Sequence, residues 1–256
     1  MKTLEESIAV AMDVQETAIV PFLSYILQDF WEIGTSPEIV INLVQKHCQD
    51  YSTLRVLDLG CGKGAVSVKL AATLNCNCLG IDGVSGFIET AKEKAREYNV
   101  EKLCQFETGD IREKIKELDK FDVIVLGAIG QVFGNYYETL ITLMKHLAPE
   151  GIIIIDDAYI EDSSTFQHPA ILSRRELLMQ IKQAKMELID EYIGGETGAS
   201  EEFENLKKRC EELIIKYPEK SALFENYIQI QADEYNVLEN EVICLTMVVK
   251  KKTNFQ

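Results

Sequence analysis

Short apolar runs alternate with longer segments of mixed polarity between about residues 54 and 156 of this chain. The apolar runs lie near 54–59, 76–82, 103–108, 121–127 and 151–156. Each run has the length of a buried strand, and the segments between the runs are long enough to form helices. This alternation of strand and helix predicts a parallel sheet that carries helices on both faces.

The segment after Asp82 shows how these helices are expected to pack. Its apolar residues recur at helical spacing: Val84, Phe87, Ile88, Ala91, Ala95 and Tyr98. Its charged residues occupy other positions: Glu89, Lys92, Glu93, Lys94 and Arg96. A helix of this kind buries its apolar stripe, so we expect the first set to be covered and the second to face water.

Residues 1 to about 50 have helical periodicity and are predicted to form an N-terminal helical cap. Apolar residues of its first half share one helical face: Ile19, Phe22, Leu23, Ile26, Leu27 and Phe30. Gly34 predicts a break, and Ser36 as N-cap with Pro37 in the first turn predicts a second helix. The principal domain then comprises residues 51–256.

The pattern changes after Asp156. A helix is expected near 173–185, a strand near 187–193 and a final strand near 242–249. Between the last two strands, at about 196–238, apolar residues recur at helical spacing on both sides of Pro218. We therefore predict a helical insertion before the last strand.

Three alternate glycines, Gly60, Gly62 and Gly64, follow the first predicted strand. Such glycines let the backbone approach a ligand closely and adopt positive φ without strain. The unpaired N–H groups that open the next helix face the same crevice. The turn therefore predicts a site for a nucleotide-like ligand.

Asp58, two residues before Gly60, helps to distinguish between the classes of ligand that such a turn can bind. Gly60, Gly62 and Ala65 also fit the loose fingerprint of dinucleotide-binding proteins. A carboxylate repels the anionic pyrophosphate of a dinucleotide, whereas it attracts a ligand that carries an ammonium group. S-adenosylmethionine carries an ammonium and a sulfonium and has no phosphate. The motif favours S-adenosylmethionine, and an NAD-dependent oxidoreductase is the first alternative.

Residues 56–64 resemble the first motif of the class I S-adenosylmethionine-dependent methyltransferases, and later motifs follow in that family's order. Asp82 resembles the acidic residue that grips both ribose hydroxyls, and Asp110 resembles the aspartate that meets the adenine amino group. The resemblance spans roughly residues 52–160. It implies an α/β fold with a doubly wound, mostly parallel seven-stranded sheet and methylation of a small molecule, as in the ubiquinone and menaquinone biosynthesis group.

The resemblance also implies which residues hold S-adenosylmethionine and its product, S-adenosylhomocysteine. They are Asp58, Gly60, Cys61, Gly62, Gly64, Asp82, Gly83, Asp110, Ile111, Leu126, Gly127 and Ala128. Asp58 is expected to hold the ammonium group of the methionine moiety. Gly83 departs from the family pattern, because a larger apolar residue usually follows the ribose carboxylate and packs on the adenine. We expect Val84 or Ile111 to form that wall instead.

The sequence indicates the binding site of the methyl acceptor less clearly than that of the cofactor. Methyl transfer from a sulfonium is an in-line displacement, which needs placement and exclusion of water more than an acid or a base. Candidate substrate contacts are Tyr25, Trp31, Gln131 and Tyr159, although the aromatic residues of the cap also suit plain core packing. His168 is a candidate base, with an ordinary surface histidine as the alternative. A non-catalytic sensor domain that binds the cofactor is the second functional alternative.

The family resemblance also bears on the two segments that the sheet does not need. The first 35 residues and the insertion near 196–238 both carry apolar stripes that must be buried. In the family a leading helical segment often folds over the cofactor. We expect both segments to cover the acceptor side of the pocket and to become ordered when cofactor binds. The alternative for the insertion is a stabilising appendage or a dimer surface.

Asp156 and Asp157 are candidate metal ligands, because metal-dependent catechol-type methyltransferases place carboxylates at the end of the fifth strand. Those enzymes add an aspartate at the end of the fourth strand, where this chain has Leu126 and Gly127. Hard cations require several oxygen ligands, so we expect no metal. The seven cysteines show no paired zinc spacing either, and we expect Cys76 and Cys78 to point to opposite faces of their strand.

Composition limits the possible binding partners and the cellular compartment of the protein. The formal net charge of −16 over 256 residues opposes binding to nucleic acid. Residues 127–135 also lack the Asn-Pro-Pro-Tyr type of run with which base-methylating enzymes hold a flipped base, which favours a small-molecule acceptor. No apolar run approaches the roughly 18 residues of a membrane span, and the N-terminus does not resemble a signal peptide. We expect a cytoplasmic protein without a membrane or nucleic-acid partner, and a homodimer is a further hypothesis.

Overall fold

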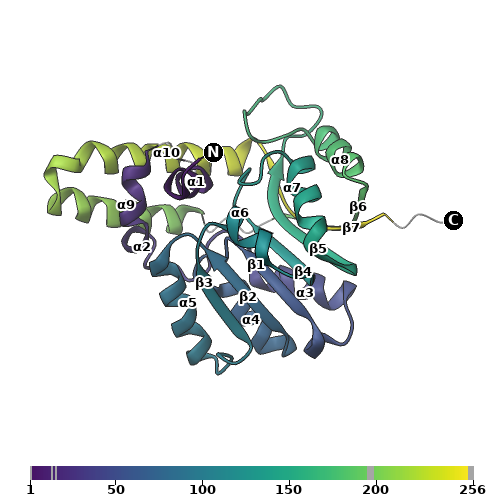
Figure 1. Ribbon diagram of the computed structural model, residues 1–256. Coiled ribbons are helices and arrows are strands. Elements are labelled where there is room, and N and C mark those ends of the chain that lie inside the picture. Colours follow the sequence, from purple (N-terminus) through teal and green to yellow (C-terminus); the bar gives the residue numbers. More distant parts are fainter. Residues whose placement is uncertain (1, 13, 15, 195–198, 253–256) are drawn as a thin grey trace.

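One seven-stranded sheet of order β3-β2-β1-β4-β5-β7-β6 organises the molecule (Figure 1). The structure is a computed structural model and describes residues 2–12, 14, 16–194 and 199–252. The strands are β1 (Arg55–Leu59), β2 (Asn77–Asp82), β3 (Cys104–Thr108), β4 (Phe121–Gly127), β5 (Leu147–Tyr159), β6 (Met186–Ile193) and β7 (Ile243–Lys251). Strands β1 to β5 pair in parallel, whereas β7 runs antiparallel to both β5 and β6. The predicted doubly wound, mostly parallel sheet is confirmed.

Helices cover both faces of the sheet, as the strand and helix alternation predicts (Figure 1). One face carries α3 (Pro37–His47), α4 (Ala65–Leu74) and α5 (Ser85–Glu97), and the other carries α6 (Ile111–Lys114), α7 (Tyr136–Leu143) and α8 (Arg174–Gln183). Because side chains alternate along a strand, Val56 packs into the first core layer and Leu57 into the second. Both residues are fully buried.

The apolar stripe of α5 packs as expected except at its end. The five residues from Val84 to Ala95 are buried, whereas Tyr98 is 43% exposed. Tyr98 lies at the C-cap of α5, where its ring meets that of Trp31 with centroids 5.1 Å apart. The prediction for Tyr98 was therefore wrong, because the helix ends before its side chain reaches the sheet.

The expected orientation of Cys76 and Cys78 was also wrong. Their sulfur atoms lie 3.8 Å apart on one face, because residues two apart in a strand share a face. Both are buried in the core layer with α3, α4 and α5. All seven cysteines are free thiols.

The N-terminal segment is only partly helical. It forms α1 (Leu4–Ala11), a 3-10 helix at 17–22 and the short α2 (Leu23–Ile26) before the chain reaches α3. The predicted break at Gly34 is confirmed, since Gly34 has φ +73°, and the next helix begins at Pro37. Ser36 stands at the N-cap of α3, but its side chain makes no capping hydrogen bond, which corrects that detail.

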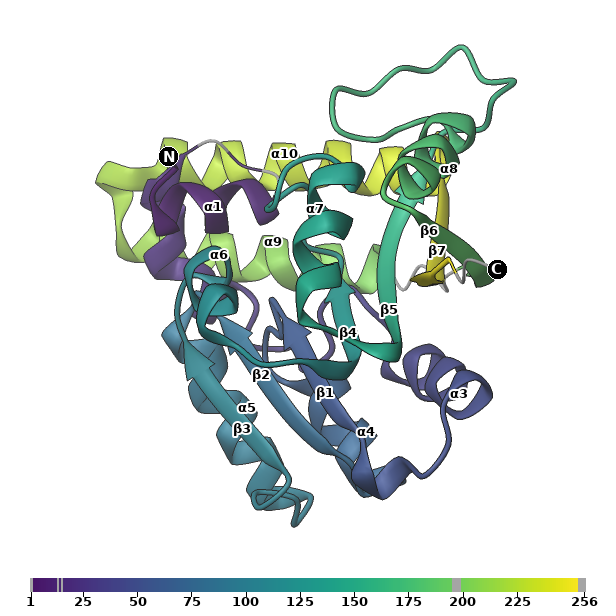
Figure 2. The same ribbon diagram turned by 45° about the vertical axis from the view of Figure 1, so that its right-hand side comes forward.

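The insertion forms two long helices, α9 (Ala199–Lys216) and α10 (Ser221–Asn240), which lie side by side beyond the sheet (Figures 1 and 2). They share a buried cluster with the N-terminal segment that includes Leu23, Ile26, Leu206 and Phe224. Arg209 of α9 also pairs with Asp29 at 2.6 Å. Residues 195–198 of the predicted insertion lie outside the described residues.

The helical cap, defined here as residues 4–30 with α9 and α10, is therefore one packed unit. Helix α3 does not belong to it, because Val40 and Val44 pack with Val56 of the sheet. Of the segment 1–50 predicted as a cap, only the part before α3 packs with the insertion. Within the described residues, no helix combines the length and the apolar character needed to cross a membrane.

Candidate active site

The glycine turn after β1 has the conformation that its sequence predicts. Gly60, Gly62 and Gly64 have φ values of +73°, +52° and +74°. A Cβ atom on Gly60 would lie 2.4 Å from Cγ2 of Ile129, so this position also lacks room for a side chain. Helix α4 begins directly after Gly64. The turn thus brings backbone close to the carboxyl edge of the sheet.

Asp58 lies in β1 beneath this turn and is almost fully buried, at 3% exposure. Its carboxylate accepts a hydrogen bond of 2.7 Å from the Ser67 hydroxyl of α4. Burial, followed by repulsion from nearby Asp82, raises the pKa of Asp58 to about 6, although the Ser67 bond opposes the rise. No cation accompanies Asp58 among the ion pairs of the described residues.

Asp82 ends β2 and ties the glycine turn to the next helix. One carboxylate oxygen accepts from the Gly62 N–H at 2.9 Å and the other from the Val84 N–H at 2.8 Å. Val84 is the N-cap position of α5. Burial raises the pKa of Asp82 despite these donors. A carboxylate oxygen keeps a further lone pair, so both oxygens remain able to accept from a ligand hydroxyl.

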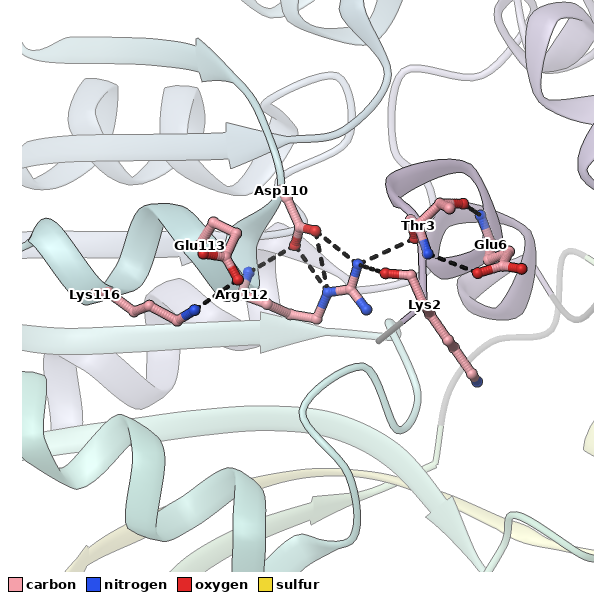
Figure 3. Close-up of polar contacts among 7 residues, drawn as sticks. All are labelled: Lys2, Thr3, Glu6, Asp110, Arg112, Glu113 and Lys116. Carbon is pink, nitrogen blue, oxygen red and sulfur yellow. Dashed lines mark hydrogen bonds and ion pairs between the residues drawn. The ribbon is translucent and has the colours of Figure 1, made fainter.

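Asp110 caps α6 and is held by a guanidinium group (Figure 3). Arg112 donates to it from Nε at 2.9 Å and from a terminal nitrogen at 2.6 Å. The hydrogen bond from Arg112 lowers the pKa of Asp110 below its usual range. The same terminal nitrogen donates to the main-chain carbonyls of Lys2 and Thr3, just before α1. The sequence prediction included Asp110 and missed Arg112.

Two neighbouring cavities collect most of the predicted cofactor residues. The larger, of about 120 Å³, is lined by Leu4, Ser7, Ile8, Ala11, Met12, Ile33, Gly34, Gly60, Gly62, Asp82, Gly83, Val84, Phe87, Gly109, Asp110, Ile111, Gly127, Ala128, Ile129 and Val132. The smaller is lined by Trp31, Ile33, Thr35, Asp58, Gly60, Cys61, Gly62, Lys63, Ala65, Val66 and Gly127. The two share Ile33, Gly60, Gly62 and Gly127. They therefore adjoin and are together called the crevice here, with Asp58 in the smaller cavity and Asp82 and Asp110 in the larger.

Gly64 and Leu126 are the predicted cofactor residues that line neither cavity. A Cβ atom on Gly64 would lie 2.7 Å from Cβ of Ala91 and 2.9 Å from the Phe106 ring, so the space beside it belongs to helix packing. Leu126 is buried in the core layer with α6, α7 and α8. The structure thus places both residues behind the crevice.

Helix α1 supplies crevice residues that the sequence prediction did not name, although it expected the first 35 residues to cover the pocket. It contributes Leu4, Ser7, Ile8, Ala11 and Met12 to the larger cavity. The spacing of four between Leu4, Ile8 and Met12 indicates one apolar helical face, but nothing local tells which surface that face meets. No residue of α9 or α10 lines either cavity. The insertion lies behind the N-terminal segment instead of directly over the crevice.

Only one of the candidate substrate contacts lines this crevice. Trp31 lines the smaller cavity and donates from its indole nitrogen to the Lys63 carbonyl at 3.0 Å. Tyr25 is exposed and donates to Glu212 of α9 at 2.6 Å, which makes it a link within the helical cap. Gln131 donates to the Ala170 carbonyl at 2.8 Å. Tyr159 is buried in the sheet core with Arg174 over its ring.

His168 is engaged by backbone in a way that disfavours the role of base. Its Nδ1 accepts from the N–H groups of Ala170 and Ile171 at 3.3 and 3.2 Å. A neutral ring whose Nδ1 accepts carries its proton on Nε2. The nitrogen that a base requires is therefore already occupied by two donors.

Asp156 and Asp157 contact hydroxyl groups at the end of β5. Asp156 accepts from Thr246 at 3.0 Å, and Asp157 accepts from the phenol of Tyr136. Burial raises the pKa of both carboxyls. Among the described residues, no group of three or more His, Cys, Asp or Glu side chains has an arrangement that suits a metal ion.

Lys63 fastens the N-terminal segment to the glycine turn. Its ammonium is buried and donates to the main-chain carbonyls of Leu27 and Phe30. Burial lowers its pKa to about 8. The Leu27 carbonyl also accepts from the Phe30 N–H at 3.1 Å, so the ammonium is a second donor to it at the point where the helical hydrogen bonding ends.

Replacing Lys63 with methionine should therefore loosen residues 23–31 and lower the free energy of unfolding by about 1 to 3 kcal/mol, because the carbonyls of Leu27 and Phe30 both lose the ammonium as a donor. Urea denaturation measures the total change, and hydrogen exchange locates it. Lys92→Met, on the exposed face of α5, is the matched control. Unchanged exchange in residues 23–31 would show that Lys63 does not hold this segment.

Comparisons with known proteins agree with this geometry. A family described as a methyltransferase domain matches residues 50–241. A ubiquinone biosynthesis O-methyltransferase from Rickettsia canadensis (strain McKiel) is 32% identical over 118 residues, covering 46% of this chain and 48% of that protein. The chain thus spans about half the length of the curated relatives that it matches.

Solved structures of methyltransferases have the same fold. A SAM-dependent methyltransferase from Geobacter sulfurreducens in complex with S-adenosyl-L-homocysteine aligns with a TM-score of 0.76 at 19% identity, covering 90% of this chain and 98% of that one. A similar enzyme from Thiobacillus denitrificans, with the same ligand, aligns with a TM-score of 0.75 at 19% identity, covering 91% and 99%. The chain therefore belongs to the methyltransferase domain family, and the resemblance of its motifs to class I S-adenosylmethionine-dependent methyltransferases is confirmed.

Proposed function

We propose that this protein transfers a methyl group from S-adenosylmethionine to a small-molecule acceptor and releases S-adenosylhomocysteine. The main observation in support is that three carboxylates lie along one crevice. Asp58, Asp82 and Asp110 lie at or just beyond the carboxyl ends of β1, β2 and β3, where an open α/β sheet binds its ligands. Their order on the adjacent strands β1, β2 and β3 matches the order of the ammonium, the ribose and the adenine in one cofactor.

The charge of the crevice disfavours a dinucleotide. Among the described residues that line the larger cavity there is no lysine, arginine or histidine to neutralise a pyrophosphate. Lys63 lines the smaller cavity, but its ammonium is bound to the carbonyls of Leu27 and Phe30. The buried carboxylate Asp58 instead suits a cationic group.

The chain's residues would promote the reaction mainly by placement. Asp58 would fix the methionine end, and the Asp82 carboxylate would fix the ribose, so that the sulfonium methyl has one direction of approach. The apolar residues Ile129 and Val132 of the larger cavity would exclude water near the acceptor. Because the sulfur leaves as a neutral thioether, this reaction class needs no proton at the donor.

The acceptor is proposed to be a small molecule of the kind that the ubiquinone biosynthesis O-methyltransferases act on. The charge of −16 supports this class over nucleic acid, because anionic surfaces repel phosphate backbones. Seven free thiols suit a reducing compartment, which supports the cytoplasm as the location. A homodimer is a further proposal, which sedimentation at several protein concentrations tests.

Calorimetry with S-adenosylmethionine, S-adenosylhomocysteine and NAD tests the cofactor. We expect micromolar binding of both sulfur ligands and none of NAD. The physical reason is that the described residues of the larger cavity include two carboxylates and no cationic side chain that could pair with a phosphate. Micromolar binding of NAD without binding of S-adenosylmethionine would overturn the proposal in favour of an oxidoreductase.

Turnover separates an enzyme from a sensor. S-adenosylhomocysteine release is measured with a panel of phenols, amines, thiols and quinone precursors. We expect release with at least one acceptor class. Tight cofactor binding without release across the whole panel would favour the non-catalytic, methyltransferase-like sensor domain.

A further inference from the structure

Gly83, beside Asp82, contributes no side chain to the wall of the crevice. A Cβ atom at Gly83 would lie 2.8 Å from Cδ1 of Ile8 and 3.1 Å from Cδ1 of Leu4. The φ of Gly83 is not in the left-handed region, so its backbone does not require glycine. The space that a side chain at this position would fill is therefore occupied by two residues of α1.

The orientation of α1 matches this placement. Leu4 and Ile8 line the larger cavity together with Asp82, Gly83 and Asp110. Ala9 of the same helix is buried in the cluster that α1 shares with α2, α9 and α10, and Ile8 also packs against that cluster. Helix α1 is thus the part of the helical cap that borders the crevice.

Arg112 holds the start of α1 in this position (Figure 3). It is the residue that joins Asp110 to the carbonyls of Lys2 and Thr3, at 3.0 and 3.1 Å. Thr3 in turn caps α1 through a reciprocal pair of hydrogen bonds with Glu6. The first turn of α1, which carries Leu4, is therefore fixed relative to the carboxylate at the adenine end.

We propose that Leu4 and Ile8 of α1 form the apolar wall that packs on the adenine, and that Arg112 is the positioning residue for this wall. This inference rests on the proposed function. It replaces the expectation that Val84 or Ile111 supplies the wall. It also gives Arg112 a joint role, because one guanidinium orients Asp110 toward the adenine amino group and closes α1 over the base.

Ile8→Ala tests the wall with a pair of ligands that differ in the base. S-ribosylhomocysteine keeps the ribose and the homocysteine of S-adenosylhomocysteine but lacks the adenine. Ile8→Ala should weaken S-adenosylhomocysteine about tenfold through lost apolar contact and leave S-ribosylhomocysteine within about twofold. Glu5→Gln, an exposed position of the same helix, should change neither ligand by more than about twofold.

A double substitution tests whether a side chain at position 83 would occupy the same space as the side chain of Ile8. Gly83→Leu alone should displace α1 and weaken S-adenosylhomocysteine, since its Cβ meets Ile8. Gly83→Leu combined with Ile8→Ala should return affinity to within about threefold of the wild type, because the leucine then forms the wall itself. Additive losses in the double variant would contradict a shared space.

Arg112→Gln tests the positioning role. It should weaken S-adenosylhomocysteine and spare S-ribosylhomocysteine, because both partners of Arg112 lie at the adenine end. Lys116→Gln removes the neighbouring ion pair with Glu113 of α6 (Figure 3), which does not reach α1, and serves as the control. Arg112→Lys should recover part of the affinity through its remaining charge.

The outcomes separate this inference from the proposed function. If the wild-type protein binds no S-adenosylhomocysteine, the function and the inference both fail. If the wild type binds and Ile8→Ala or Arg112→Gln weakens both ligands equally, or neither, the function stands and the inference is wrong.

Discussion

Replacing Asp82 with alanine should weaken S-adenosylhomocysteine by about 2 to 4 kcal/mol, or roughly 30-fold or more in dissociation constant. The variant loses the charged group that we propose as acceptor for two ribose hydroxyls. It also releases the Gly62 N–H, which Asp82 holds at 2.9 Å, so the glycine turn is no longer fixed. Calorimetry with the purified variant measures the effect.

The two contributions of Asp82 can be separated with a ligand that lacks one hydroxyl. If Asp82 contacts the ribose, Asp82→Ala should lose less affinity for 2′-deoxy-S-adenosylhomocysteine than for the parent ligand. Asp119→Ala, an exposed carboxylate in the loop before β4, is the control. An affinity for S-adenosylhomocysteine within about threefold of the wild type would show that Asp82 is misplaced at the ribose.

The sheet and the carboxylates were predictable from sequence because both depend on local patterns. A strand buried on both faces appears as a short apolar run, and parallel strands direct their carboxyl ends to one edge. Asp82 and Asp110 come at or shortly after such runs, so their convergence follows from the order of strands and helices alone. The conformations of Gly60 and Gly64 follow for the same reason, since a tight turn requires positive φ.

The adenine wall was not predictable because it depends on contacts between distant parts of the chain. Arg112 meets the carbonyl of Lys2, 110 residues earlier, and Ile8 meets the space above Gly83. Neither pair shares an element or a motif. The sequence did show that Gly83 departs from the family and that something else must fill its place, which is the signal that the structure then explains.

The two candidate aromatic contacts of the N-terminal segment have different surroundings, again because of contacts between distant parts of the chain. Tyr25 and Trp31 lie six positions apart in one segment, yet Tyr25 faces Glu212 of α9 and Trp31 lines the smaller cavity. The segment between them is not a continuous helix, because α2 ends at Ile26 and the carbonyls of Leu27 and Phe30 accept from Lys63 beyond that end. Helical periodicity therefore gives the wrong relation between the two side chains.

Asp58→Asn should have opposite effects on the free protein and on the complex. The folded-state pKa of Asp58 is raised from 3.8 to about 6, so folding favours its protonated form. Stability contributed by this group is present at low pH and is lost as the pH rises through the interval between these values. At neutral pH the buried charge costs on the order of 2 to 3 kcal/mol, which the neutral amide avoids. The unliganded variant should therefore unfold at a higher temperature than the wild type.

Ligand binding should respond in the other direction, because the same charge is the proposed partner of the methionine ammonium. Asp58→Asn should weaken S-adenosylmethionine about 30-fold or more and leave adenosine, which has no ammonium, nearly unchanged. The wild-type affinity for S-adenosylmethionine should also fall as the pH drops below about 6, where Asp58 takes up a proton. Calorimetry of both ligands between pH 5 and pH 8, beside thermal unfolding of the free proteins, measures all three effects. Equal losses for S-adenosylmethionine and adenosine would remove Asp58 from the methionine end of the crevice, even if the variant is more stable.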